Sequence, residues 1–262
     1  MRLNQEPDPL KAISPQKPNL STDDGLVDLL YTCGLMKKRT VPKKAVKSAG
    51  RKSSGIPSHV HPYGANVHRD LDWHEKKFQK LTGRLPADGQ KTVQRALDYS
   101  RDRHGSQQRY GGSPYIIHPL RISNILMSEW GVLNAAVIAA ALLHDVVEDT
   151  QTTIKEIKDT FGDEIGKLVD GMTMWKGSET YELYCKRVAR GPQNLRIIKC
   201  ADVLDNLRSW HEVGETPDAM TRWWREVNGC VLPIADATEP QAAASIRALL
   251  EDRWYLKMAQ MQ

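Results

Sequence analysis

The amino-acid sequence predicts an all-α protein, a single bundle of seven to nine helices around one core. From about residue 86 onward, apolar side chains recur at the three- and four-residue spacing of amphipathic helices. Residues 135–143 are an unbroken run of alanine, valine, isoleucine and leucine, which indicates one buried helix. No stretch alternates apolar and polar residues as a strand does, and no segment is repeated.

The first expected helix of the main domain spans residues 92–103, whose apolar residues share one face, and Gly105 ends it. A glycine-rich loop over residues 111–114 leads to the next helix, over residues 118–129. His118 and a proline begin this second helix. Proline is favoured in a first helical turn, where a backbone N–H group has no partner within the helix and its loss costs nothing.

The apolar run at 135–143 begins a helix that we expect to continue to residue 148. Thr153 is suited to cap a short helix over residues 153–158. Apolar spacing predicts the remaining helices over residues 163–172, 179–189, 192–212, around 221–224 and 240–258. We expect residues 90–235 to form the main domain and residues 236–262 to form a C-terminal helix that packs on it.

Positive charge is concentrated near the N-terminus. Residues 1–90 carry 16 Lys and Arg against 9 Asp and Glu, whereas residues 91–262 carry 21 against 23. Residues 1–68, rich in Pro, Ser, Lys and Gly, are predicted to be a disordered basic leader, followed by a linker with a short helix at 69–89. Residues 37–52 hold eight basic side chains and no acidic one, which suits either a weak contact with nucleic acid or another anionic surface, or a solvated tail.

Composition excludes several classes of protein. No apolar run reaches the roughly 18–20 residues of a membrane span, and the chain does not open with the pattern of a signal peptide. The four cysteines form no paired motif, so we expect free thiols and a cytoplasmic location.

The segment 144–150 brings four metal- or proton-binding side chains together: His144, Asp145, Glu148 and Asp149. If the buried helix continues through them, His144 and Glu148 share one face, as do Asp145 and Asp149. Charged groups at the end of a buried helix are costly to desolvate unless a cation neutralises them. The pattern therefore favours a metal site.

Two other segments can complete a set of ligands. His118 lies at the start of its helix, and Asp202 and Asn206 lie one turn apart in the helix expected over residues 192–212. Two imidazole nitrogens with two carboxylate oxygens suit a divalent first-row metal that also binds water. Such a water can ionise near neutral pH and attack phosphorus.

The order His … His-Asp … Asp resembles the HD phosphohydrolase superfamily. The surrounding segments are similar to the hydrolase domain of RelA/SpoT-type alarmone enzymes, in particular the stand-alone small alarmone hydrolases, over about residues 90–235. The segments that carry this similarity are Arg109, Gly112, 114–120, 141–150, 160–162, 168–173 and 199–202.

The resemblance implies a single HD-domain bundle with one metal ion, usually Mn²⁺. The ligands that it implies are His118, His144, Asp145 and Asp202. Glu148 and Asp149 would handle the water and the proton of the leaving group, while Arg109 and Asn206 would bind the nucleotide. The implied reaction removes the 3′-pyrophosphate of guanosine tetra- or pentaphosphate (ppGpp or pppGpp), leaving GDP or GTP, and a toxic alarmone synthetase would be the counterpart.

The chain departs from this pattern at three positions. Val203 and Asp205 stand where the long enzymes carry Arg and His, and Tyr110 stands where a basic residue is common. A less positive pocket rim leaves an adenosine alarmone analogue or NADPH open as the substrate. A non-catalytic nucleotide-binding regulator is a further hypothesis, against which the presence of Glu148 and Asp149 speaks, because a sensor does not need them.

Overall fold

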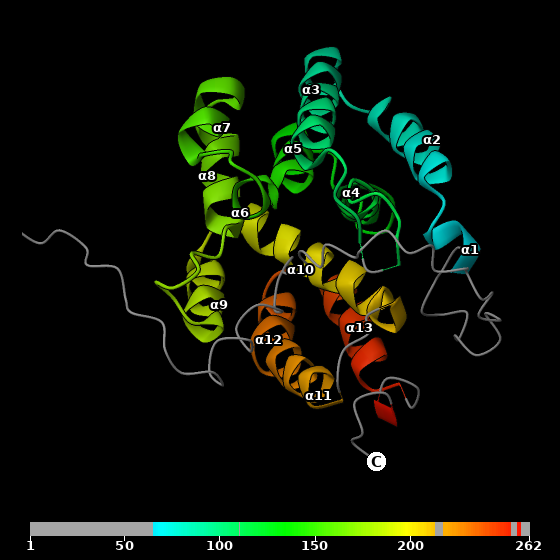
Figure 1. Ribbon diagram of the computed structural model, residues 1–262, viewed down its shortest axis with the longest axis vertical. Helices are drawn as coiled ribbons and strands as arrows, with labels where there is room; N and C mark the ends of the chain where they lie inside the picture. Colours follow the sequence, from blue (N-terminus) through cyan, green and yellow to red (C-terminus); the bar gives the residue numbers. More distant parts are fainter. Residues whose placement is uncertain (1–64, 110, 213–216, 253–255, 258–262) are drawn as a thin grey trace, which may run out of the picture. The chain divides into compact units, whose positions relative to one another are not determined.

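The computed structural model describes residues 65–109, 111–212, 217–252 and 256–257. In this part of the chain the prediction of an all-α fold is confirmed, and no strand is present beyond one isolated bridge between Gln108 and Pro114 (Figure 1). The first seven helices are α1 (Ala65–His68), α2 (Leu71–Thr82), α3 (Ala87–His104), α4 (Ile117–Ser128), α5 (Ala135–Leu143), α6 (Val146–Asp149) and α7 (Ile154–Phe161). The others are α8 (Asp163–Met172), α9 (Tyr181–Arg190), α10 (Gln193–Arg208), α11 (Pro217–Glu226), α12 (Leu232–Asp236) and α13 (Pro240–Leu250).

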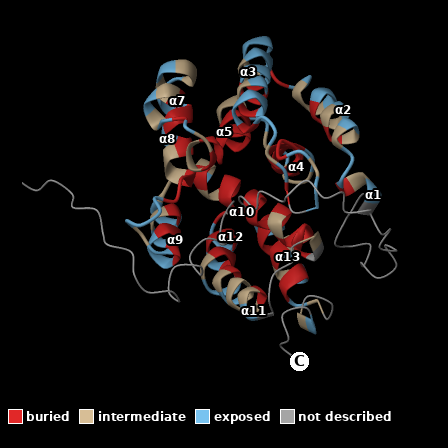
Figure 2. Ribbon diagram, in the orientation of Figure 1, coloured by how far each residue is buried: buried red, intermediate tan, exposed pale blue. Residues whose placement is uncertain are grey.

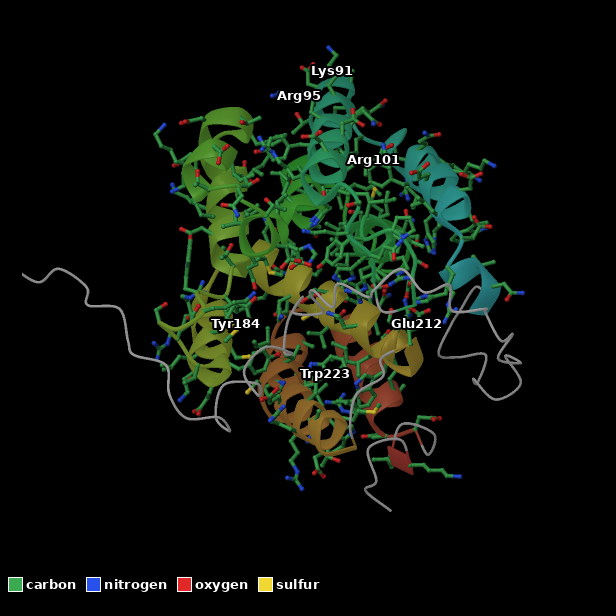
Figure 3. All side chains as sticks on the ribbon, in the orientation of Figure 1. Lys91, Arg95, Arg101, Tyr184, Glu212 and Trp223 are labelled. Carbon is green, nitrogen blue, oxygen red and sulfur yellow. The ribbon has the colours of Figure 1, made fainter. Side chains whose placement is uncertain are left out.

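The helix α5 lies at the centre of the core. Its residues from Val137 to Leu143 are completely buried, and it packs against α3, α4, α8 and α10. Buried residues are concentrated on α4, α5, α10 and α13 in Figure 2. Charged side chains such as Lys91 and Arg95 point outward from α3 (Figure 3). Because α4, α5 and α10 touch one another, polar side chains on their facing surfaces share one buried space.

The expected continuous helix from residue 135 to 148 is wrong. The helix α5 ends at Leu143, a two-residue turn at His144 and Asp145 follows, and the short α6 begins at Val146. Asp145 departs from helical geometry, with φ −96° and ψ −7°, a region in which many active-site residues lie. Because the helix is interrupted at these two residues, side-chain positions cannot be taken from one straight helix.

The expected number of seven to nine helices is also wrong, because the described residues form thirteen α-helices. Turns divide several of the expected helices, and some of the helices are very short, such as α1, α6 and α12. Individual ends differ as well. The helix predicted from Thr92 begins at Ala87, and the one predicted to end at Lys158 runs to Phe161, where Gly162 with φ +88° stops it.

The C-terminal part differs from the prediction in its end points. The helix α13 ends at Leu250 rather than residue 258 and packs against α10 and α12. A short π-helical segment, Val227–Val231, joins α11 to α12. The helix α10 ends at Arg208, and a 3₁₀ turn, Trp210–Glu212, follows it where the sequence predicted one continuous helix.

The interval 69–89, predicted as a linker with a short helix, contains α2, a twelve-residue helix that packs against α4. Its inner face buries His74 and Phe78. Asp70 caps this helix by accepting a hydrogen bond from the backbone N–H of Trp73 at 3.0 Å. The basic stretch at residues 37–52 lies outside the described residues.

None of the described helices combines the length and apolar character that crossing a bilayer requires. None of the described cysteines, which are Cys185, Cys200 and Cys230, forms a disulfide.

Candidate metal centre

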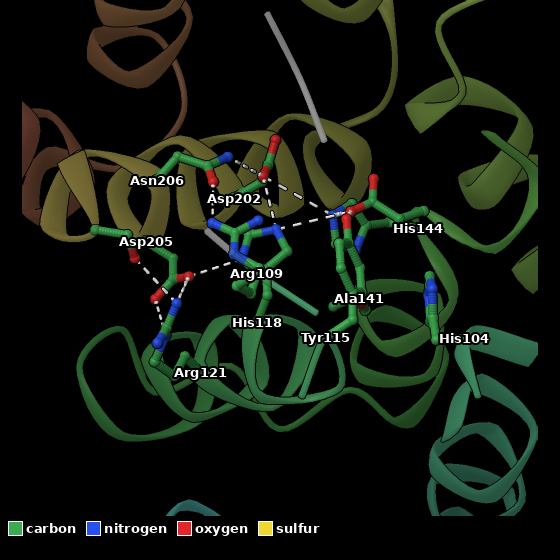
Figure 4. Close-up of polar contacts among 12 residues, drawn as sticks. His104, Arg109, Tyr115, His118, Arg121, Ala141, His144, Asp202, Asp205 and Asn206 are labelled. Atoms are coloured by element: carbon green, nitrogen blue, oxygen red, sulfur yellow. Dashed lines mark hydrogen bonds and ion pairs between the residues drawn. The ribbon is translucent and has the colours of Figure 1, made fainter. Parts of the chain in front are cut away.

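Two histidines and two aspartates meet in the buried space between α4, α5 and α10. His118, His144 and Asp202 of this group are labelled in Figure 4. Asp202 Oδ1 lies 3.3 Å from Nε2 of His118 and 3.8 Å from Nε2 of His144. Asp145 Oδ2 lies 3.1 Å from Nε2 of His144 and 3.8 Å from Nε2 of His118. Ligand atoms of the two histidines and Asp145 all lie within 4.8 Å of one another.

Each of these side chains is placed by a different element. His118 is the second residue of α4, whereas His144 and Asp145 form the turn between α5 and α6. Asp202 lies in the middle of α10, 57 residues further along the chain than Asp145. All four are at most 4% exposed, so their charges are removed from water and must be balanced locally.

The hydrogen bonds of the two histidines test whether a metal would fit. Nδ1 of His118 is 2.7 Å from a carboxylate oxygen of Asp205, and Nδ1 of His144 donates to the carbonyl oxygen of Ala141 at 2.9 Å. Among the described residues, the buried Nε2 atom of either ring has no hydrogen-bond partner. In the neutral form of each ring, with the proton on Nδ1, Nε2 has a lone pair that faces the carboxylates. This donor set fits a divalent cation.

The two carboxylates are held in the ionised form that a metal requires. Burial by itself raises the pKa of Asp145, but the charge and hydrogen bond of His144, together with the charge of His118, outweigh burial and lower this pKa well below its usual value. The hydroxyl of Tyr115 also donates to Asp145. Burial likewise opposes ionisation of Asp202, but the ammonium group of Lys199, 3.0 Å away and fully buried, lowers the pKa of that carboxyl.

Glu148 has a different environment from the other carboxylates. Its side chain is only 3% exposed, and its Oε1 accepts a hydrogen bond from the backbone N–H of Met174 at 2.8 Å. Burial, followed by the negative charge of Asp145, raises the pKa of Glu148 to about 8, although Lys176, 3.8 Å away, acts in the opposite direction. Glu148 can therefore carry a proton at neutral pH.

A cavity of about 530 Å³ opens beside Glu148 and Asp149. Its lining residues come from α3, the loop after it and the α6 region: Asp102, Arg103, Gln107, Glu148, Asp149, Thr150 and Gln151. The two faces of this cavity are joined by a hydrogen bond from the side-chain amide of Gln107 to the carbonyl oxygen of Asp149 at 2.9 Å. The two carboxylates therefore border a space in which a reacting group can lie.

Arg109 and Asn206 are brought together although 97 residues separate them. Nη2 of Arg109 donates to the side-chain oxygen of Asn206 at 2.8 Å, and the amide of Asn206 donates to Asp202 at 2.7 Å. The loop that holds Arg109 is closed by its N–H bond to Ser113 and by Gly112, whose φ of +83° suits only glycine well. Arg109 is 4% exposed, and its buried Nη1 has no hydrogen-bond partner among the described residues.

Comparison with known proteins shows the family to which this chain belongs. The HD domain family matches residues 96–194. The guanosine-3′,5′-bis(diphosphate) 3′-pyrophosphohydrolase MESH1 of Mus musculus is 32% identical over 165 residues, which are 60% of this chain and 92% of that protein. The chain belongs to this HD-domain family. A solved structure described as a metazoan ortholog of SpoT that hydrolyses ppGpp superimposes with a TM-score of 0.58 at 27% identity, over 63% of this chain and 97% of that one.

Longer relatives match this chain over only a small part of their own length. A probable GTP pyrophosphokinase of Mycobacterium leprae is 40% identical over 168 residues, 61% of this chain but 20% of that protein. The guanosine-3′,5′-bis(diphosphate) 3′-pyrophosphohydrolase of Aquifex aeolicus is 39% identical over 141 residues, again 20% of that protein. The chain thus spans about a fifth of the length of these curated relatives.

Five residues of the HD-domain site were not assigned a role from the sequence. They support the predicted ligands and acid groups, and they are Tyr115, Arg121, Lys176, Lys199 and Asp205. A spacing signal for three of them was present: Arg121 follows His118 by three residues, and Lys199 and Asp205 lie three residues before and after Asp202 in α10, so each pair shares a helix face. The contacts of Tyr115 and Lys176 join segments far apart in the chain, which spacing does not reveal.

Proposed function

We propose that this chain is a metal-dependent hydrolase that removes the 3′-pyrophosphate of guanosine tetra- or pentaphosphate. The observation that carries the proposal is the meeting of two unpartnered histidine Nε2 atoms with the carboxylates of Asp145 and Asp202, beside the buried acid Glu148. The substrate class follows the printed names of the MESH1 and Aquifex aeolicus relatives.

His118, His144, Asp145 and Asp202 would hold one divalent ion, for which we propose Mn²⁺ because nitrogen and oxygen donors with open positions suit it. When bound, the ion lowers the pKa of water and offsets negative charge that develops at phosphorus. Tyr115 and Lys199 keep the two aspartates oriented and ionised, so both carboxylates are available to the cation.

Glu148 and Asp149 would manage the protons of the reaction. With its pKa near 8, Glu148 is mostly protonated at pH 7 and can donate a proton to the departing ribose 3′-oxygen, which is otherwise a poor leaving group. Arg109 would bind a phosphate or base oxygen through its Nη1, while Asn206 holds the other side of its guanidinium in place. The cavity beside Glu148 and Asp149 offers space for a phosphate group.

A panel of nucleotides tests the proposal. The purified full chain is incubated with ppGpp, pppGpp, the adenosine analogue or NADPH, each with Mn²⁺ and with an excess of EDTA, and products are separated by ion-exchange chromatography. We expect GDP or GTP with pyrophosphate from the guanosine substrates, and no product in EDTA. Faster turnover of the adenosine analogue or of NADPH would reassign the substrate, and the absence of any product would contradict an enzymatic function.

The basic leader and the biological partners are separate proposals. We infer that residues 37–52 contact nucleic acid or another anionic surface weakly, and that the enzyme works in the cytoplasm, where it counteracts a toxic alarmone synthetase. Deleting residues 1–64 should leave nucleotide turnover unchanged and abolish a salt-dependent affinity for nucleic acid. Equal nucleic-acid affinity with and without the leader would contradict its role.

A further inference from the structure

Behind the candidate metal centre, His118 contacts a buried ion pair. Nδ1 of His118 lies 2.7 Å from Oδ2 of Asp205, and Asp205 is 1% exposed. The same carboxylate is held by Arg121, whose Nε is 2.7 Å from Oδ1 and whose Nη2 is 2.9 Å from Oδ2. In Figure 4 the labelled Arg121 and Asp205 lie on the side of His118 away from His144.

This ion pair determines which nitrogen of His118 carries the proton. A carboxylate that receives two N–H groups from a guanidinium acts as an acceptor, so Nδ1 of the ring must be the donor. Its Nε2 is then left with the lone pair, directed toward Asp145 and Asp202. His144 lacks such support, because its Nδ1 donates to the neutral carbonyl oxygen of Ala141.

Arg121 is itself fixed on its other side. Its Nη1 donates to the backbone carbonyl of His68 at 3.0 Å, and its Nη2 also donates to the hydroxyl of Ser209 at 3.0 Å. Nε2 of His68 forms a hydrogen bond with the same Ser209 hydroxyl at 3.0 Å. Helices α1, α4 and α10 therefore converge on one guanidinium, which restricts the positions that Asp205 can adopt.

We propose that Asp205 and Arg121 are positioning residues that hold His118 in its metal-binding orientation and tautomer, and so raise the affinity of this chain for its divalent ion. The inference rests on the metal role given to His118 in the proposed function. A carboxylate that accepts the second N–H of a ligating histidine fixes the ring and increases the basicity of the ligand nitrogen. Arg121 balances the charge of Asp205, so this support adds no net negative charge beside Asp145 and Asp202.

The chain offers a matched control for this pair. Arg208, the last residue of α10, makes two hydrogen bonds of 2.8 Å to the carboxylate of Glu129, which follows the end of α4. Both ion pairs thus join the same two helices through a two-point contact, but only Asp205 touches a candidate ligand. Loss of either pair disturbs the helix packing, whereas only loss of the first removes support from His118.

The experiment compares Asp205→Asn/Arg121→Met with Glu129→Gln/Arg208→Met in the full chain, both charges of each pair being removed together so that none is left buried alone. Mn²⁺ affinity is measured by isothermal titration calorimetry without nucleotide, and folding is checked by circular dichroism. We expect the Kd for Mn²⁺ to rise about 10- to 100-fold in the first variant and less than about threefold in the second. Equal losses in the two variants, or an unchanged Kd in the first, would overturn the proposal.

If the first double variant does not fold, Asp205→Asn alone replaces it, because the amide preserves the shape and an oxygen acceptor for Nδ1. A Kd for Mn²⁺ raised several-fold supports the proposal, and a Kd equal to that of the natural chain overturns it. The proposed function is judged separately by hydrolysis: a chain that binds Mn²⁺ but hydrolyses no nucleotide contradicts that function alone. Failure of the natural chain to bind Mn²⁺ would overturn both.

Discussion

Replacing Glu148 by glutamine should remove the alkaline limb of the pH–rate profile. The pKa of Glu148 is raised to about 8 by burial and by the charge of Asp145, so about nine-tenths of the side chain is protonated at pH 7. Raising the pH through 8 removes this proton, and kcat/KM should fall about tenfold per pH unit above that value. Glutamine keeps an oxygen for the N–H of Met174 but has no proton to lose, so Glu148→Gln should be about 10²- to 10⁴-fold slower and lack this limb.

Substitution of the neighbouring Lys176 should shift the midpoint pH of the alkaline limb while Glu148 itself is unchanged. Its ammonium lies 3.8 Å from Oε2 of Glu148 and is partly exposed, so a water-like dielectric is appropriate for the estimate. Coulomb's law then gives about 1 kcal/mol, which corresponds to about 0.8 pH unit. Because the cation favours the ionised carboxylate, Lys176→Met should move the limb to higher pH by about this amount.

The assay for both variants follows the release of pyrophosphate from ppGpp between pH 6 and 10 at saturating Mn²⁺. Circular dichroism of each variant at both ends of this range shows whether the fold is retained. An alkaline limb with the same midpoint in the natural chain and in Glu148→Gln would refute the acid role of Glu148.

Three further predictions concern the metal, the nucleotide and the fold. Burial lowers the pKa of His144, but the charge and hydrogen bond of Asp145, together with the charge of Asp202, outweigh burial and raise this pKa to about 9. A proton therefore competes with the cation, and Mn²⁺ affinity measured by calorimetry should rise up to about tenfold per pH unit between pH 7 and 9; an affinity independent of pH would contradict this. Arg109→Ala should lower kcat/KM for ppGpp about 10- to 100-fold through lost charge-assisted hydrogen bonds, and wild-type kinetics would exclude Arg109 from the nucleotide site. Phe78→Ala should reduce the free energy of unfolding in urea by about 3–5 kcal/mol, because this ring is 1% exposed; a loss below 1 kcal/mol would show that α2 is not part of the core.

The all-α fold could be predicted because it depends on local patterns. The alanine-rich run of α5 contains only apolar residues, which predicts a buried helix. Thr153, with Glu156 three residues later, forms the capping box that begins α7. The end of α5 could not be predicted in the same way. Neither glycine nor proline marks the turn at His144 and Asp145, and the helix propensity of the preceding residues favours continuation.

The order of His and Asp residues in the sequence identified the candidate ligands, but the sequence did not reveal which residues surround and support those ligands in the fold. His118, His144 and Asp202 were selected by type and by motif order, and the structure brings Nε2 of both histidines within 3.8 Å of Oδ1 of Asp202. The support from Asp205 and Arg121 depends on contacts across 84 residues between two helices. A sequence pattern indicates which residues share a face of one helix, but it does not show which face of another helix lies opposite.

The most direct test of the account is the position of a bound metal ion. Crystals of the full chain grown with Mn²⁺ and measured at the manganese absorption edge should give one strong anomalous peak, about 2.0–2.3 Å from Nε2 of His118 and His144 and from carboxylate oxygens of Asp145 and Asp202. An anomalous peak elsewhere, or no peak at saturating Mn²⁺, would contradict the claim that these four side chains hold one cation.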